Sequence, residues 1–467
     1  MSILWTKEAA VAATGGDAIG DWSVGGVSID TRELNAGDLF VALKDVRDGH
    51  DFVAQALAAG AGAAMVSHRP EGVSKDAPLL IVADVLRGLE DLGLAARART
   101  NAKVIGVTGS VGKTGTKEML RAALQVQGKV HAAVRSFNNH WGVPLTLARM
   151  PADTDFAVIE IGMNNPGEIG PLAKMAQLDV AVITTVAAVH MAAFDNVEQI
   201  ADAKAEIFEG LSENGVAILN ADIPTLPILK KARGDGRSVL FGQSAGADIR
   251  LIKASVSDHG SAVEAVLHGD PILFKLGAPG EHLAMNGLAV LAAVEAAGGD
   301  VAQSMLALAS WQAPSGRGQR FTVQLGETGG SVELIDESYN ANPTSMVAAL
   351  AVLAAATPAQ ENGRCVAFLG DMLELGPQEQ AYHSDLSDAV PMAAIDKVHT
   401  SGPLMAALHA ALPDHRRGQH FDAAAQMAAC VNRLLDSGDV AMVKGSLGSK
   451  VGQVVTAIKT LGQTSEK

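Results

Sequence analysis

Lys113 and Thr114 close the stretch VTGSVGKT (residues 107–114), whose composition is typical of a phosphate-binding loop. An apolar run, VIGV, precedes the loop and a helical pattern, KEMLRAALQVQG, follows it, so the loop is predicted to join a strand to a helix. Glycines there let backbone N–H groups approach phosphate oxygens, and the helix N-terminus adds its positive dipole. Lys113 would neutralise β- and γ-phosphate charge, and Thr114 would offer a hydroxyl to Mg²⁺.

The loop departs from the generic pattern GxxxxGK[ST] at one position. The first glycine of that pattern falls at Val107, and the nearest glycines are Gly106 and Gly109. The order of strand, GKT and helix still favours a phosphate site of a variant class over a purely structural turn.

Two further polar side chains follow buried strands of the same region. Glu160 ends the apolar run FAVIE, and His190 follows the run VAVIT. The carboxyl ends of parallel strands meet at one sheet edge, where α/β proteins build their sites. A carboxylate in apolar surroundings needs a partner, which is Mg²⁺ in one interpretation and a salt bridge in the other. His190 is either a site residue or a structural histidine of the core or a loop.

Lys204 lies on the apolar stripe of a predicted helix. The segment NVEQIADAKAEIFEGL (196–211) has helical spacing, and its stripe consists of Val197, Ile200, Lys204, Ile207 and Leu211. Burial would lower the pKa of the amine and make it a nucleophile that can take up CO₂ as a carbamate, able to hold a second metal. The alternative is a snorkelling lysine whose head group reaches water.

Three other polar stretches are candidates for binding. Asn138 and Asn139 lie in SFNNHWGVP, where they would bind a polar substrate or cap a turn. The stretch IDESYNANP (335–343) places two acids and two asparagines just after a strand, and KGS (444–446) opens a helix as a second possible anion site. Each of these stretches also has a purely structural interpretation.

Strands that alternate with helices must position all these residues. Apolar runs such as 39–43, 63–67, 156–161, 180–184 and 365–370 alternate with helical stretches, which predicts an α/β protein with largely parallel sheets. We expect three domains: a small α/β domain over 1–100, a central P-loop domain with a mostly parallel sheet over 101–313, and a Rossmann-like domain over 314–467. Antiparallel hairpins are predicted at 247–276, a linker at 313–320, and a disordered tail, QTSEK.

Composition limits the class of protein. The 36 basic and 51 acidic residues give a net charge of −15, which argues against a surface that coats nucleic acid or anionic membranes. Two cysteines without a CxxC motif exclude a disulfide framework or a zinc knuckle. The start, MSILWTKEAA, lacks a signal-peptide core, and no apolar run reaches the ~18 residues of a membrane span. We expect a monomeric cytoplasmic protein with no nucleic-acid partner and no membrane span.

Taken together, the motifs resemble those of the Mur ligase family. The matching stretches run in order from about residue 28 to 456: DTRELNAGDLFVAL, DGHDF, TGSVGKT, FNNHWGVPLTL, AVIEIGMNNPGEI, DAKAEIF, DESYNANPTSM, GDMLELG and VKGS. DESYNANPTSM and GDMLELG resemble most closely the members that add D-alanyl-D-alanine to UDP-N-acetylmuramoyl-tripeptide. The resemblance implies an ATP-dependent peptide ligase that works through an acyl phosphate and gives UDP-N-acetylmuramoyl-pentapeptide, ADP and phosphate for peptidoglycan synthesis. The alternative is another Mur-type or folylpolyglutamate-type amide ligase.

The resemblance also implies roles for individual residues. Residues 1–100 would bind the UDP-sugar, the central domain ATP, and the third domain D-alanyl-D-alanine with part of the nucleotide. ATP would contact Thr108, Gly109, Ser110, Val111, Gly112, Lys113, Thr114, Asn286, Arg317, Asp336, Asn340 and Asn342. Thr114, Glu160, His190 and a carbamylated Lys204 would hold Mg²⁺, and Lys113, Glu160, His190 and Lys204 would be catalytic. The substrates would contact Ser28, Thr31 and Arg32 at the uridine diphosphate, Asn138 and Asn139 at the peptide stem, and Lys444 and Ser446 in the third domain.

Overall fold

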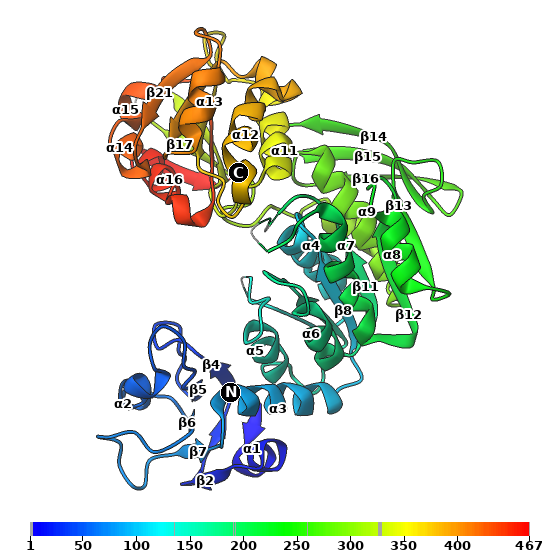
Figure 1. The fold of residues 1–467 in the computed structure, drawn as a ribbon, viewed down its shortest axis with the longest axis vertical. Coiled ribbons are helices and arrows are strands. Elements are labelled where there is room, and N and C mark those ends of the chain that lie inside the picture. Colours follow the sequence, from blue (N-terminus) through cyan, green and yellow to red (C-terminus); the bar gives the residue numbers. More distant parts are fainter. Residues whose placement is uncertain are drawn as a thin grey trace.

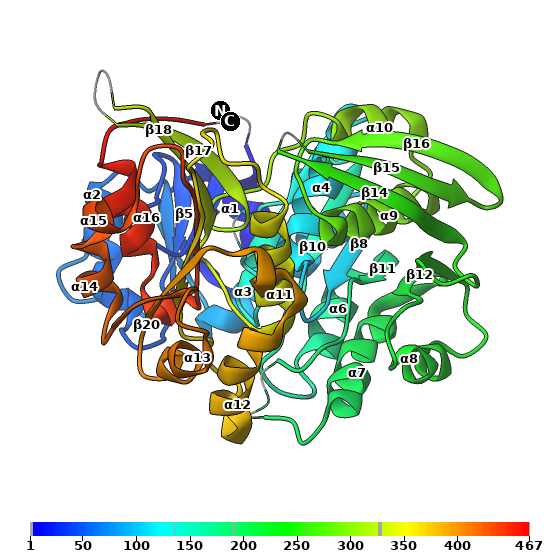
Figure 2. The same cartoon turned by 90° about the horizontal axis from the view of Figure 1, so that it is seen from above.

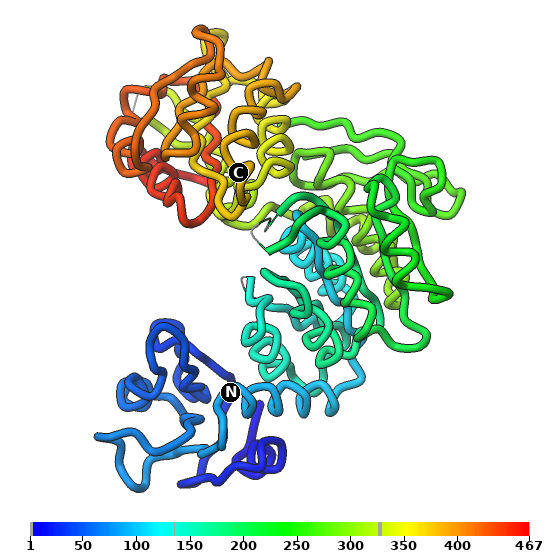
Figure 3. The backbone as a smooth tube through the Cα atoms, in the orientation of Figure 1, coloured from blue at the N-terminus to red at the C-terminus, as the bar shows by residue number. Residues whose placement is uncertain are grey.

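A computed structural model describes residues 3–134, 136–189, 191, 193–258, 260–325 and 329–466. The chain forms three α/β units that follow one another along an arc, each built on its own main sheet (Figure 1). Figure 3 traces the chain from the first unit through the central one to the third. The predicted three-domain α/β fold class is confirmed. None of the helices in the described ranges is long and apolar enough to cross a membrane.

The first unit has a five-stranded sheet with helices on its faces. Its strand order is β2 (Asp17–Ile19), β7 (Leu79–Ile81), β6 (Ala63–Val66), β5 (Asp38–Val41) and β4 (Gly26–Ser28), and all pairs except β2–β7 are parallel. Its helices are α1 (Lys7–Thr14), α2 (Val53–Ala58) and α3 (Val85–Ala98). Helix α5 (Gly142–Ala148) of the central unit packs Leu145 and Ala148 into this core, and Trp5 Nε1 donates to the Ala148 carbonyl oxygen at 2.9 Å. The first two units therefore share a packed interface.

The central sheet has nine strands. In order they are β16 (Asp270–Leu276), β15 (Gly260–Leu267), β14 (Ile249–Ser257), β13 (Ser238–Gly242), β12 (Leu211–Asn220), β11 (Leu178–Ile183), β8 (Lys103–Thr108), β10 (Phe156–Glu160) and β9 (Val130–Ala132). Pairing is parallel from β9 to β14 and antiparallel from β14 to β16, so the predicted hairpins at 247–276 are confirmed.

Helices cover both faces of the central sheet, which explains why its strands are apolar on both sides. Helices α4 (Lys113–Gln125) and α9 (Glu281–Ala296) pack on one face with Ile105 and Val107 of β8. Helices α6 (Ile169–Ala176) and α7 (Val197–Ala205) pack on the other face with Val104. The carboxyl ends of β8, β10 and β11 consequently meet at one edge between these helix layers.

The third unit is a doubly wound sheet with an antiparallel edge. Its order is β21 (Arg417–Phe421), β20 (Lys397–Ser401), β19 (Cys365–Gly370), β22 (Val440–Lys444), β18 (Ser331–Glu337), β17 (Gln319–Gln324) and β23 (Gln463–Glu466). The pairs from β21 to β18 are parallel, with α11 (Pro343–Ala354) and α13 (Met405–Ala411) on one face and α16 (Gly452–Lys459) on the other. Figure 2 shows this unit beside the central one, with α11 between them.

Two sequence predictions need correction. The tail is predicted to be disordered, but Gln463–Glu466 form β23 and pair with β17, since backbone hydrogen bonds hold an edge strand whose side chains are all exposed. The helix predicted over 196–211 ends at Ala205; a 3-10 turn covers Glu206–Gly210, and Leu211 begins β12. The buried stripe that contains Ile200, Lys204 and Ile207 is nevertheless present.

The β14–β15 hairpin reaches the third unit. Arg320 Nη1 of β17 donates to the Asp258 carbonyl oxygen at 3.1 Å and to Glu333 Oε1 at 2.7 Å. The backbone N–H of Thr357 donates to Asp258 Oδ1 at 3.2 Å. The central and third units therefore touch through this hairpin as well as through the connecting segment before β17.

Candidate functional site

The stretch at 108–113 joins β8 to α4 in a tight turn that two glycines make possible. Gly109 has φ +150° and Gly112 has φ +88°, values that residues with side chains rarely adopt. A Cβ on Gly109 would lie 1.9 Å from Thr184 Oγ1. Val107, where the generic motif has glycine, is a buried β8 residue paired with Glu160, so the turn needs no glycine there.

The turn is fastened to the residues that follow β11. Ser110 donates its backbone N–H to the Thr185 carbonyl oxygen at 2.9 Å and its hydroxyl to the Ala187 carbonyl oxygen at 3.0 Å. Thr184 Oγ1 donates to the Val111 carbonyl oxygen at 2.5 Å. These contacts fix the turn against the segment after β11, and the N-terminus of α4 that follows is suited to bind an anion.

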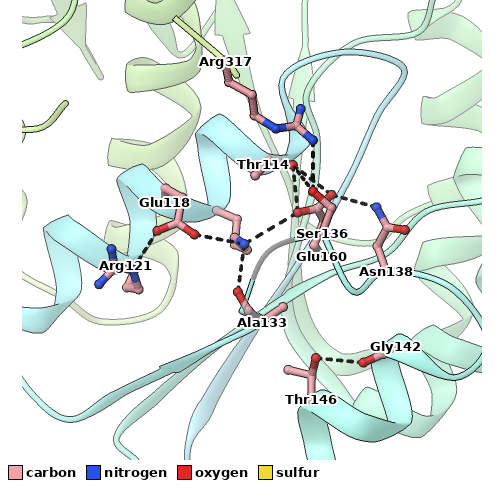
Figure 4. A network of polar contacts seen from close by, with 11 residues as sticks. Thr114, Glu118, Arg121, Ala133, Ser136, Asn138, Gly142, Thr146, Glu160 and Arg317 are labelled. Carbon is pink, nitrogen blue, oxygen red and sulfur yellow. Dashed lines mark hydrogen bonds and ion pairs between the residues drawn. The ribbon is translucent and has the colours of Figure 1, made fainter. Parts of the chain in front are cut away.

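A polar cluster surrounds Glu160 at the end of β10 (Figure 4). Thr114 Oγ1 donates to Glu160 Oε1 and Oε2, at 3.1 and 3.0 Å, and Asn138 Nδ2 donates to Oε1 at 2.8 Å. Ser136 Oγ lies 3.2 Å from Thr114 Oγ1 and accepts a 3.0 Å hydrogen bond from Arg317 Nη2. Three segments distant in sequence, α4, the loop at 136–138 and the segment before β17, thus meet beside one carboxylate that is 1% exposed.

These side chains fit a magnesium ion bound together with a nucleotide. A carboxylate and a hydroxyl are the hard oxygen ligands that Mg²⁺ prefers, and Mg²⁺ usually takes only one or two carboxylates and completes its shell with phosphates and water. Within the described ranges, no group of three or more His, Cys, Asp or Glu side chains could form an all-protein metal cage. The predicted ligand His190 lies outside the described residues.

Lys113 and Lys204 both have lowered pKa values beside this cluster. Burial lowers the pKa of the Lys113 ammonium, the Glu160 carboxylate opposes that shift, and Arg317 adds to it. Lys113 Nζ donates to the Gly109 carbonyl oxygen at 2.6 Å. Lys204 is 2% exposed, and burial, then the Lys113 charge, hold its pKa well below the ordinary value. Its head group therefore does not snorkel to water, and the alternative of a surface lysine does not apply.

A cavity of about 330 Å³ lies over this cluster, between the central and third units. Most of the predicted nucleotide and substrate residues line it: Ser110, Val111, Gly112, Lys113, Thr114, Asn138, Asn139, Glu160, Asn286, Arg317, Asn340, Asn342 and Lys444. The guanidinium of Arg317 lies 4.3 Å from the centre of the Tyr339 ring, and Lys444 Nζ donates to Glu337 Oε2 at 3.0 Å. The cavity thus brings together residues of the phosphate loop, of α9, of the segment before β17 and of the loop after β18.

A few predicted residues do not line this cavity. Thr108 and Gly109 lie beneath it, and Lys204 is buried beside it. Asp336 accepts the Ser338 hydroxyl at 2.6 Å and lines a separate shallow hollow with Lys450. Ser446 Oγ accepts the Leu373 N–H at 3.0 Å and is buried. In this geometry Asp336 and Ser446 order loops around the cavity.

A second cavity, of about 1000 Å³, lies at the first unit. Ser28, Thr31 and Arg32 line it. Its charged lining is mixed, with the basic residues Lys44, Arg47 and Arg149 and the acidic residues Asp30, Glu33, Asp45, Asp48 and Asp84. One loop of the central unit borders both cavities: Phe137, His140 and Trp141 face the large one, and Asn138 and Asn139 face the smaller one. The two cavities are therefore neighbours across this loop.

Lys117, Ser136 and Tyr339 are site residues that the sequence analysis missed. Lys117 follows Lys113 by one helical turn inside the pattern GKTGTK, and that spacing on a buried helix face was a usable signal. Ser136 and Tyr339 carry no such signal, because their roles arise from contacts across units with Arg317.

Comparison with known proteins agrees with this architecture. Family models match in three consecutive segments: the Mur ligase family catalytic domain at 23–102, the Mur ligase middle domain at 107–294, and the Mur ligase glutamate ligase domain at 319–447. The UDP-N-acetylmuramoyl-tripeptide--D-alanyl-D-alanine ligase of Escherichia coli K12 is 36% identical over 446 residues, 95% of each chain.

Solved structures show the same three-unit arrangement. MurF from Acinetobacter baumannii superposes with a TM-score of 0.84 at 28% identity, over 98% of this chain and 99% of that one. MurF ligase from Thermotoga maritima in complex with ADP superposes with a TM-score of 0.76 at 26% identity, over 93% of this chain and 97% of that one.

Proposed function

This chain belongs to the Mur ligase family, and we propose that it is the ATP-dependent ligase that joins D-alanyl-D-alanine to UDP-N-acetylmuramoyl-tripeptide. The observation that carries the proposal is the loop that borders both cavities. The large cavity has room for a nucleoside diphosphate sugar, whose phosphates would lie near Lys44, Arg47 and Arg149, and Ser28, Thr31 and Arg32 are among its lining residues. The peptide stem would then pass Asn138 and Asn139 and bring its terminal carboxylate to the phosphate site.

Catalysis would proceed by two substitutions. An oxygen of the stem carboxylate attacks the γ-phosphorus of ATP, so that ADP leaves and an acyl phosphate forms. The amine of D-alanyl-D-alanine then attacks the acyl carbon, phosphate leaves, and the amine nitrogen loses a proton. Lys113 and Arg317 would neutralise charge on the transferring phosphoryl group, and closure of the units over the bound substrates would exclude the water that hydrolyses acyl phosphates.

Thr114, Glu160 and His190 would hold Mg²⁺, which when bound supplies charge neutralisation to the phosphates. Lys204 is suited to carbamylation because its lowered pKa favours the neutral amine that reacts with CO₂. As a carbamate, Lys204 would carry a carboxylate-like group beside Lys113 and offset the positive charge there.

The third unit would supply the dipeptide site and part of the nucleotide site. Lys444 is 2% exposed and is held by Glu337 and by the Asn340 carbonyl oxygen, at 3.0 and 2.9 Å, so a positive charge is fixed at the cavity wall. Such a charge suits the carboxylate of D-alanyl-D-alanine. The product would be UDP-N-acetylmuramoyl-pentapeptide, made by a monomeric enzyme in the cytoplasm for peptidoglycan synthesis.

The test is release of inorganic phosphate from ATP in the presence of UDP-N-acetylmuramoyl-tripeptide, with and without D-alanyl-D-alanine. We expect sustained release only with the dipeptide, together with a product whose mass equals that of the pentapeptide conjugate. Release with another amine acceptor but not with D-alanyl-D-alanine would assign the chain to a different amide ligase of this architecture. Release without any acceptor would overturn the ligase proposal.

A further inference from the structure

Lys117 is a fully buried lysine at the base of the phosphate site. It lies on α4 one turn after Lys113, its side chain is 0% exposed, and it is not among the residues that line the nucleotide cavity. Its ammonium therefore cannot touch a substrate held in that cavity. An ammonium buried this deeply is stable only when carboxylates and carbonyls surround it.

Among the described residues, the contacts of Lys117 come from three parts of the central unit. Its Nζ lies 3.0 Å from Glu118 Oε1 on α4 and 3.9 Å from Glu160 Oε2 at the end of β10, and donates to the Ala133 carbonyl oxygen after β9 at 2.8 Å. Glu118 in turn accepts a 2.7 Å hydrogen bond from Arg121. The chain of charges thus runs from the surface of α4 to the carboxylate of the phosphate site.

We propose that Lys117 is a positioning residue, which fixes the Glu160 carboxylate from below so that the carboxylate faces the metal and nucleotide above. This inference rests on the proposed function, in which Glu160 holds Mg²⁺. Thr114 and Asn138 hold Glu160 from the cavity side, and Lys117 supplies the contact on the opposite side. Without Lys117, Glu160 would depend on Thr114 and Asn138, which line the cavity that a metal and nucleotide would fill.

The direction in which metal affinity changes when Lys117 is replaced distinguishes a positioning role from a purely electrostatic one. A positive charge 3.9 Å from Glu160 repels a divalent cation, so removal of that charge alone would tighten metal binding. Loss of positioning would weaken binding, by about 10- to 100-fold as for other outer-shell partners of metal ligands. If Lys117 only ties α4 to Ala133, its replacement would lower stability without weakening metal binding.

The experiment measures Mn²⁺ binding by electron paramagnetic resonance, on the full chain with a non-hydrolysable ATP analogue. Lys117→Met removes the charge at similar volume, and Lys129→Met, at an exposed ion pair with Asp153, is the matched control. We expect about 10- to 100-fold weaker Mn²⁺ binding in Lys117→Met and none of this loss in the control. Unchanged or tighter binding would overturn the proposal.

Glu118→Gln keeps the inference testable if Lys117→Met does not fold. Glu118 is 18% exposed, and its neutralisation removes the nearer carboxylate from Lys117 and leaves Glu160. Lys117 would no longer be fixed by Glu118 and would hold Glu160 in a less defined orientation, so we expect Mn²⁺ affinity to fall several-fold, whereas wild-type affinity would contradict the positioning role. If the proposed metal site itself is wrong, the wild-type protein will not bind Mn²⁺ with the nucleotide, and this result is distinct from a failure of the positioning role alone.

Discussion

Thr114 Oγ1 lies within hydrogen-bonding distance of both carboxylate oxygens of Glu160, at 3.1 and 3.0 Å. The two residues are 46 positions apart, and the sheet brings them together because β8 and β10 pair in parallel with Val107 opposite Glu160. The phosphate loop and the carboxylate are therefore held in register by backbone pairing, and their side chains complete the contact.

We expect Thr114→Val to weaken the site and Thr114→Ser to preserve it. Valine has the same shape but cannot donate a hydrogen bond to the Glu160 carboxylate, which is 1% exposed. Loss of the donor to a buried acceptor costs about 1–3 kcal/mol of stability. Chemical unfolding of the two variants and the Mg²⁺ dependence of phosphate release measure the two consequences. Equal behaviour of the Thr114→Val and Thr114→Ser enzymes would show that the hydroxyl has no part in the site.

Lys113→Met is expected to abolish ligation without loss of the fold. The lysine is half-buried at the surface of the cavity, so its removal leaves the helix intact but takes a positive charge from the transferring phosphoryl group. A loss of about 10²-fold or more in turnover is typical for one such stabilising group. Steady-state phosphate release and circular dichroism melting decide the outcome, and full turnover would remove the loop from the proposed mechanism.

Lys204→Ala is expected to lose activity and regain part of it with added formate or acetate. The cavity left by the side chain would admit a short carboxylate in place of the carbamate, whereas an uncarbamylated lysine would have no such substitute. The assay compares phosphate release with formate and with chloride at equal ionic strength. A Lys204→Ala enzyme that is fully active, or inactive with every carboxylate, would contradict the carbamate hypothesis.

Much of the phosphate site was predictable from sequence because its parts are local. The strand, the GKT turn and the helix follow one another, and apolar runs mark where β8, β10 and β11 end. Glu160 could therefore be assigned to the same sheet edge as Lys113 before any geometry was known. Lys204 was likewise predictable, because it is a charged residue at an apolar position of the helical pattern, and it is buried in the structure.

The contacts between units were not predictable in this way. Arg317 bonds Ser136 across 181 positions, and the hairpin residue Asp258 bonds Thr357 across 99, and neither pair leaves a periodic pattern in the sequence. Strand β23 was missed because its side chains are polar and show no apolar pattern. Its extended conformation depends on backbone pairing with β17. Asp336 accepts hydrogen bonds from the Ser338 N–H and hydroxyl, and its expected contact with the nucleotide stays a prediction.

His399 predicts an acid-sensitive third unit. Its ring is 5% exposed, stacks on Phe368, and accepts the Gln419 N–H at Nδ1 at 3.0 Å. Burial, reinforced by nearby Arg364, Lys397 and His409, lowers its pKa from 6.5 to about 4. Because the folded pKa lies below the unfolded one, the stability of the neutral ring is full above pH 6.5 and is lost as pH falls toward 4.

The loss of folding stability is about 3 kcal/mol for this one histidine, because each unit of pKa shift corresponds to about 1.4 kcal/mol. We expect His399→Asn, whose side-chain oxygen can replace Nδ1 as the acceptor, to lose less stability than the wild type between pH 7.5 and 4.5. His415→Asn, at an exposed histidine of the same unit, is the matched control and should keep the wild-type slope. Urea unfolding at both pH values measures the difference, and parallel slopes for His399→Asn and the wild type would exclude His399 as the acid-sensitive group.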